Sequence, residues 1–239
     1  MKTNPENQLA SNRIDWMLKR FVVLLFLLWS VVARAQLFTW DDGSVNTFGG
    51  TPSGDLLALN HFNTGGSPVL VDEIRVLWNP ISSTVKPTVA LYSDPNGDGN
   101  PSDMTPLLLQ PISIPANVVI LNNTTVQGYS IPATLVNGSF FVGAYLSDKE
   151  PSFDPVIGVD LAHLGPNQSW IIENSTAGLL NLMNPFGTST LKTPLDTFIA
   201  GNHMIEAHFR PVPEPSSCIV LAFGLLCFAV RVAGRTPLI

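Results

Sequence analysis

The stretch VLVDEIRVLWN, residues 69–79, contains an alternation of apolar and polar side chains, clearest from Glu73 onward. In an extended chain Ile74, Val76 and Trp78 fall on one face, and charged or amide side chains fall on the other. A period of two residues is the pattern of a β-strand with one face buried and one face in water. This segment therefore predicts an antiparallel sheet that packs one side against a core.

Similar short segments follow each other through the middle of the chain, separated by turns rich in glycine, proline and asparagine. No window of 11 or more residues keeps a helical apolar period without a proline or glycine inside it. We therefore predict an all-β fold, a single antiparallel β-sandwich or jelly-roll-like domain over residues 36–211. The other expected strands are 88–93, 139–147 and 203–210, with weaker patterns at 56–62, 107–114, 125–131, 156–161, 169–173 and 197–200.

The composition divides the chain into a polar middle and two apolar ends. Only 13% of the 239 residues are charged, against about 25% in a typical soluble domain. The apolar excess lies in Phe21–Val32 and Cys218–Val230, and residues 36–213 carry five cations and fifteen carboxylates. A net charge near −10 argues against binding to nucleic-acid phosphates or to an anionic membrane surface. The many apolar residues also argue against a disordered acidic chain.

Residues 1–35 have the layout of an export signal. Lys19 and Arg20 come directly before an apolar run of 12 residues, which as a helix is about 18 Å long and too short to span a bilayer. Ala33 and Ala35 supply the small residues that a signal peptidase accepts, so we expect cleavage between Ala35 and Gln36. The long leading segment of 20 residues leaves an uncleaved membrane anchor as the alternative.

Residues 212–239 contain a proline-flanked glutamate, an apolar run and two arginines, in that order. The run of 13 residues, Cys218–Val230, is predicted to form a hydrophobic helix. Two prolines around Glu214 forbid a helix there and keep the peptide extended. The residues of this pattern are Val212, Pro213, Glu214, Pro215, Ser216, Arg231 and Arg235.

This arrangement closely resembles the PEP-CTERM sorting signal of exported bacterial proteins. The resemblance implies an exosortase-type membrane protease as a partner, together with secretion and a destination at the cell surface or in extracellular polymer. It also implies that the C-terminal helix holds the protein at the inner membrane for a time, with the arginines on the cytoplasmic side. A permanent C-terminal anchor is the alternative. Cys218 and Cys227 both lie in the apolar run, so the middle domain has no cysteine.

The loop DPNGDGNPSD, residues 94–103, is the strongest chemical signal in the middle of the chain. Its first half matches an EF-hand calcium loop, with oxygen-bearing side chains at alternate positions and then a glycine. The second half departs from that pattern, because Thr105 stands where a glutamate is required. We predict a calcium site here, with an ordinary polar turn as the alternative. The candidate ligands are Asp94, Asn96, Asp98, Asn100 and Asp103.

The sequence gives little support for catalysis, and we predict no catalytic residues. It holds no G-x-S-x-G motif. His61, His163, His203 and His208 are interpreted as structural or surface residues. The neighbouring carboxylates Asp41-Asp42 and Asp72-Glu73 are expected to point to opposite faces of any strand, which makes them poor glycosidase pairs.

Aromatic side chains raise the question of carbohydrate binding, because sugar rings stack on flat aromatic faces. The candidates are Trp40, Trp78, Tyr92, Tyr129, Tyr145 and Trp170. Trp78 shares a face with Ile74 and Val76 and is interpreted as a core residue, as is Trp170 unless it lies at the edge of a loop.

Three functions are therefore open. The first is an exported, non-enzymatic surface or extracellular-matrix protein. The alternative is a carbohydrate-binding module braced by calcium, with extracellular polysaccharide as its partner. The third, with the least support, is a hydrolase of extracellular polysaccharide.

Overall fold

The computed structural model describes residues 36–40, 45–49, 54–78, 86–113, 126–149, 157–161 and 168–212, and the isolated residue 224. The strands are β1 Gln36–Phe38, β2 Thr47–Gly49, β3 Gly54–Asn63, β4 Val69–Val76, β5 Lys86–Ser93, β6 Thr105–Pro111, β7 Gln127–Val136, β8 Ser139–Lys149, β9 Ile157–Asp160, β10 Ser169–Asn174, β11 Leu191–Pro194, β12 Asn202–His203 and β13 Ile205–Pro211. The helical turns are η1 Pro101–Asp103, α2 Pro185–Thr188 and η2 Leu195–Thr197. The prediction of an all-β fold is confirmed.

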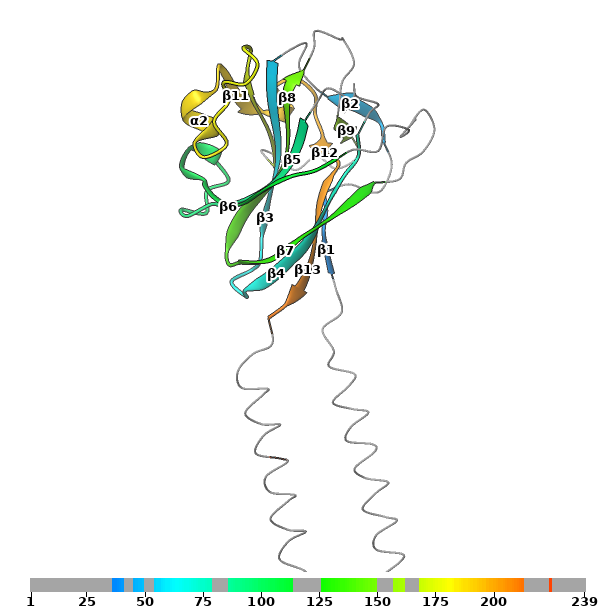
Figure 1. Cartoon of the computed structure of the whole chain (residues 1–239). Coiled ribbons are helices and arrows are strands. Elements are labelled where there is room, and N and C mark those ends of the chain that lie inside the picture. The colour runs from blue at the N-terminus through cyan, green and yellow to red at the C-terminus, as the bar shows by residue number, and fades with distance from the viewer. Residues whose placement is uncertain are drawn as a thin grey trace, which may run out of the picture. The chain divides into compact units, whose positions relative to one another are not determined.

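The strands form two large antiparallel sheets and one small sheet (Figure 1). A four-stranded sheet has the order β1-β13-β4-β7, and a six-stranded sheet has the order β11-β10-β3-β8-β5-β6. The small sheet has the order β12-β9-β2. Most neighbours are far apart in the sequence, so the fold depends on long-range pairing.

The main core lies between the two large sheets. Ile74 and Val76 of β4 are fully buried in one cluster with Ala58 of β3 and Val142 of β8. Because these residues come from both sheets, the sheets pack face to face in a sandwich-like arrangement. Ile74, Val76 and Trp78 are therefore all buried, as predicted, and Trp78, 1% exposed, is the core residue that the sequence indicated.

A second apolar cluster lies on the outer face of the six-stranded sheet. It contains Leu57 and Leu59, which alternate along β3 with the residues of the main core. Residues 175–190 contribute Leu180 to this cluster, and Phe186 packs against it. This segment therefore covers one face of the sheet, and α2 is part of it.

The segment 175–190 is fastened to the sheet by a buried carboxylate. Asp55, at the start of β3, accepts hydrogen bonds from the backbone N–H groups of Gly178 and Leu180, each at 2.8 Å. The hydroxyl of Tyr92 donates to the carbonyl of Leu182 at 3.2 Å.

Most of the expected strands are present, and one is wrong. Residues 197–200 are not a strand: Thr197 ends η2, and Phe198 and Ile199 donate backbone hydrogen bonds to the carbonyl of Leu195. Leu195 is buried there and Phe198 is 58% exposed, so a tight turn and not alternation decides the burial. The strands β1, β2 and β11 were not predicted, because three or four residues carry too little pattern.

The prediction that Asp72 and Glu73 point to opposite faces is also wrong. The register between β4 and β7 shifts between Val71 and Glu73, which marks a β-bulge. Val71 and Ile74 are both buried, and the two carboxylates between them both lie on the outer face. A bulge inserts one extra residue and so breaks the alternation of side chains.

Several predicted features lie outside the described residues. These are the signal segment with Ala33 and Ala35, the sorting residues Pro213, Glu214, Pro215, Ser216, Arg231 and Arg235, and also Asp41, Asp42 and His163. Among the residues that the structure describes, no helix is long and apolar enough to cross a membrane.

Candidate functional site

The loop between β5 and β6 is built from turns that its own side chains close. The backbone N–H of Asp98 donates to Asn96 Oδ1 at 3.0 Å, and that of Asn100 donates to Asp98 Oδ1 at 2.7 Å. Gly97 and Gly99 have φ angles of 72° and 73°, in the left-handed region that glycine adopts without strain. The alternation of glycine with asparagine or aspartate therefore specifies the path of this loop.

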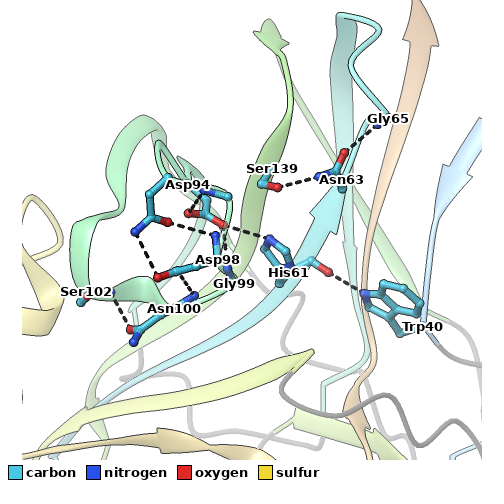
Figure 2. Close-up of polar contacts among 12 residues, drawn as sticks. Trp40, His61, Asn63, Gly65, Asp94, Asp98, Gly99, Asn100, Ser102 and Ser139 are labelled. Carbon is cyan, nitrogen blue, oxygen red and sulfur yellow. Dashed lines mark hydrogen bonds and ion pairs between the residues drawn. The ribbon is translucent and has the colours of Figure 1, made fainter.

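Asp94 is the fixed point of the loop. Its side chain is fully buried and accepts three hydrogen bonds (Figure 2). The backbone N–H of Gly97 donates to Oδ1 at 3.0 Å, and that of Gly99 donates to Oδ2 at 3.0 Å. The third donor is His61 Nε2, 3.1 Å from Oδ2. A carboxylate held by several donors has a defined orientation before any ligand arrives.

His61 reaches this loop from β3. Its ring packs against Phe141 with 5.0 Å between centroids. Burial lowers the pKa of His61 below its ordinary value of 6.5, and the charge of Asp94 opposes that shift. Burial therefore favours the neutral imidazole, and Nε2 is assigned as the donor because it lies against a carboxylate oxygen.

The sequence pattern does not connect His61 with the loop that holds Asp94. The two residues are 33 positions apart, and β8 lies between their strands. The alternation of β3 places His61 on the same face as Leu57 and Leu59, but that pattern alone does not say which loop covers the face.

Three carboxylates of the loop come together. Asp94, Asp98 and Asp103 each offer an oxygen, and these oxygens lie within 4.8 Å of one another. Asp94 is buried, Asp98 is exposed and Asp103 lies between these extremes. Asp103 Oδ1 is buried and has no hydrogen-bond partner.

This geometry fits a hard cation. Calcium binds oxygens at about 2.3–2.6 Å, so two oxygens on opposite sides of one ion are about 5 Å apart. Asn96 and Asn100, the other predicted ligands, have side-chain oxygens that accept hydrogen bonds from Asp98 N and Ser102 N. Their observed role is to shape the loop, and the carboxylates form the cluster.

A second polar cluster is buried where β3, β10 and β12 meet. Asn60 Nδ2 donates to the carbonyl of His203 at 2.6 Å and to that of Ile205 at 2.9 Å. The hydroxyl of Ser169 donates to Asn60 Oδ1 at 2.5 Å. His203 is 1% exposed, and burial lowers its pKa to about 4, while the backbone of Trp170 acts in the opposite direction.

His208 and His203 lie on different strands and in different surroundings. His208 Nδ1 is 3.0 Å from Asp72 Oδ1, and Arg210 Nε is 3.5 Å from Asp72 Oδ2. Glu73 is paired instead with Arg75 at 3.0 Å. The two neighbouring carboxylates share a face, yet each is held by a different cationic group and they do not form a joint site.

The aromatic candidates are largely covered. Trp78, Tyr92 and Tyr145 are buried. Trp40, Tyr129 and Trp170 are partly buried and pack against the two apolar clusters. These six side chains therefore serve mainly in packing.

No known family model matches this chain, and no curated protein matches it either. Among solved structures, it is similar to the clostridial cysteine protease Cwp84 C116A after propeptide cleavage, with 14% identity, a TM-score of 0.47, and coverage of 74% of this chain and 40% of that chain. A structure of the cysteine protease and lectin-like domains of Cwp84, a surface layer associated protein of Clostridium difficile, gives 13% identity, a TM-score of 0.45 and coverage of 74% and 36%. The chain thus spans less than half the length of these proteins, and such likeness says nothing about activity.

Proposed function

We propose that this chain is an exported, non-enzymatic protein of the cell surface or extracellular matrix, sorted by a PEP-CTERM and exosortase-type system. The observation that carries the proposal is the sorting pattern at residues 212–239, which begins where the last strand ends. Val212 donates a backbone hydrogen bond to the carbonyl of Pro68 at 3.5 Å, and the proline-flanked glutamate follows directly. A sorting tag needs this position, because the processing enzyme must reach it without opening the domain.

The proposal extends to the partners and the route. Signal peptidase would remove residues 1–35, and the C-terminal helix would hold the protein at the inner membrane until the exosortase-type protease acts. The negative charge of residues 36–213 makes nucleic acid an unsuitable partner.

We also propose that the domain is a jelly roll. Taking β1, β3, β4, β5, β6, β7, β8 and β13 as strands one to eight, the four-stranded sheet has the order 1-8-3-6. Four adjacent strands of the larger sheet have the order 2-7-4-5. These two orders are those of an eight-stranded jelly roll made of two Greek keys. The strands β10 and β11 extend its larger sheet.

The sorting proposal is tested by the mass and location of the protein in cells. In a strain without the exosortase, we expect a longer form that stays with the membrane fraction. Glu214→Ala should give the same result in the parent strain, whereas the neighbouring change Ser217→Ala should leave processing unaltered. An unchanged mass and location in the deletion strain would refute the proposal.

A second candidate is a carbohydrate-binding module braced by calcium. The cluster of Asp94, Asp98 and Asp103 supports it, together with the unpartnered Oδ1 of Asp103. Calcium would link Asp94 at the start of the loop to Asp98 and Asp103 further along it, and so stiffen the loop. This is a structural role. The third alternative, a hydrolase, gains no support from Asp72 and Glu73, since Arg210 pairs with Asp72 and Arg75 pairs with Glu73.

Calcium titration of the purified domain tests this candidate. We expect calcium to raise the melting temperature, and Asp98→Asn to abolish that rise. Asp72→Asn removes the same charge from the outer face of the other sheet and should leave the calcium response intact. If calcium changes neither the melting temperature nor retention on polysaccharide, this candidate is excluded.

A further inference from the structure

The first and last strands of the domain are partners. In β1, Gln36 pairs with Phe209, Leu37 with His208 and Phe38 with Ala207. The sheet order β1-β13-β4-β7 places β13 between β1 and β4 and leaves β1 at the edge. Within the described residues, β1 therefore has no strand to pair with until the last strand is in place.

One aromatic side chain holds β1 in position. The ring of Phe38 stacks on Phe209, with 4.0 Å between centroids and 22° between planes. It also meets the edge of Phe140 at 5.2 Å. The neighbouring Leu37 is 39% exposed and contributes little burial. Three residues paired with β13 and the stacking of Phe38 on Phe209 therefore hold β1. Phe140 of β8 and Phe62 of β3 add further ring contacts to Phe38.

The first residue of β1 is also the residue that follows the expected cleavage point. A peptidase binds its substrate as an extended, unpaired segment on both sides of the bond that it hydrolyses, and a folded segment must open before it can be cut. In the folded domain β13 pairs with the three residues that follow the bond, Gln36, Leu37 and Phe38. In the folded domain the peptidase therefore cannot bind these residues as an unpaired segment.

From this geometry we infer that docking of β13 closes the Ala35–Gln36 bond to hydrolysis, so that leader removal precedes completion of the fold. The inference rests on the proposed export. The order of the strands along the chain favours leader removal before folding is complete, because β13 leaves the export channel after every other strand. Until then β1 is unpaired, and the bond is open to the peptidase.

The other end of the domain behaves differently. The buried apolar residues of β13 are Ile205, Ala207 and Phe209. A cut after Val212 removes none of them and breaks no strand pairing among the described residues. We therefore expect the sorting tail to be removable from the folded domain, whereas removal of the leader requires β1 to open.

The test uses the purified full-length precursor, folded in detergent, and purified bacterial signal peptidase. A synthetic peptide of residues 25–42 serves as the unfolded reference. We expect the folded precursor to be cut at least roughly tenfold more slowly than the peptide, because cleavage needs β1 to open. Equal rates for the precursor and the peptide would overturn the inference.

Two variants test whether contact between β1 and β13 is what slows cleavage of the folded precursor. Phe209→Ala leaves the cleaved sequence unchanged but removes the ring on which Phe38 stacks, so we expect its precursor to be cut at least severalfold faster. Leu135→Ala, an exposed side chain on β7, is the matched control and should leave the rate unchanged. If circular dichroism shows that Phe209→Ala does not fold, Phe38→Ala is compared instead with its own peptide. A folded variant that is cut no faster than the parent would refute the inference.

The N-terminus of the protein recovered from cells distinguishes a failure of the proposed leader cleavage from a failure of the inferred order of events. If it is not Gln36, the proposed leader cleavage fails, whatever the rates are. If it is Gln36 and the folded precursor is cut as fast as the peptide, export stands and only the order of events is wrong.

Discussion

Asn60 connects three strands through a single buried side chain. It lies on β3, donates to two carbonyl groups at β12 and β13, and accepts a hydrogen bond from Ser169 of β10. Replacing it with Leu keeps the branched shape but removes the donor to two buried carbonyls and the acceptor of one of the hydrogen bonds of Ser169. We expect Asn60→Leu to lower the free energy of unfolding by about 3 kcal/mol. Urea denaturation measures this loss. For comparison, Asn184→Ala removes the exposed N-cap of α2, which accepts a hydrogen bond from Gly187 N, and should cost about 1 kcal/mol.

His203 makes stability depend on pH. Its pKa is lowered from 6.5 to about 4 by burial, so the folded state holds the neutral ring. The unfolded chain takes up the proton first as the pH falls, and stability therefore decreases between pH 6.5 and 4. The full loss is about 3 kcal/mol, since each pKa unit corresponds to about 1.4 kcal/mol.

A variant separates this effect from the titration of the carboxylates. His203→Phe keeps a neutral ring at every pH, so the difference in unfolding free energy between parent and variant should move in favour of the variant as the pH falls from 7 to 4. The lowered pKa of His61 acts in the same direction in both proteins and cancels in the difference. A difference that stays constant over this range would contradict the prediction.

At the scale of elements, the segment 175–190 behaves as a cover over one face of the larger sheet. Asp55 fastens its start through the two N–H groups of Gly178 and Leu180. We expect Asp55→Ala to release the segment, because the backbone N–H groups of Gly178 and Leu180 then lose the carboxylate that accepts their hydrogen bonds. Limited proteolysis should then cut within residues 175–190 while the two sheets stay folded.

The control for this release is Leu179→Ala in the same segment. Leu179 is 58% exposed and its truncation removes little buried area. Its proteolysis should match that of the parent. Protection of the segment in Asp55→Ala would show that the apolar contacts of Leu180 and Phe186 hold it without the carboxylate.

At the scale of the whole molecule, the last strand completes the fold. Ile205, Ala207 and Phe209 of β13 all lie in the main core, and β13 joins β1 to β4. A chain of residues 36–212 should therefore fold and unfold cooperatively. A chain of residues 36–204 should stay unfolded, because about three apolar side chains and two rows of strand pairing are lost together. Circular dichroism and amide exchange distinguish these outcomes, and a folded 36–204 would contradict the role given to β13.

By itself, the sequence determined the features that depend on neighbouring residues. Alternation at residues 69–79 and its counterparts predicted the all-β class and most of the strands, and the glycines at 97 and 99 indicated a tight loop. These signals are local, because the pleat of a strand and the left-handed turn are properties of consecutive residues. The sorting and leader patterns are likewise read directly from consecutive residues and remain predictions.

Only the tertiary structure decided which of these pieces meet. His61 reaches Asp94 across β8, Asp72 and Glu73 share a face because of a bulge, and β1 pairs with the last strand. None of these follows from local periodicity, because strand order and register are set by the packing of two sheets around a common core. The residues that complete a site are therefore found only when the strands that carry them are in place.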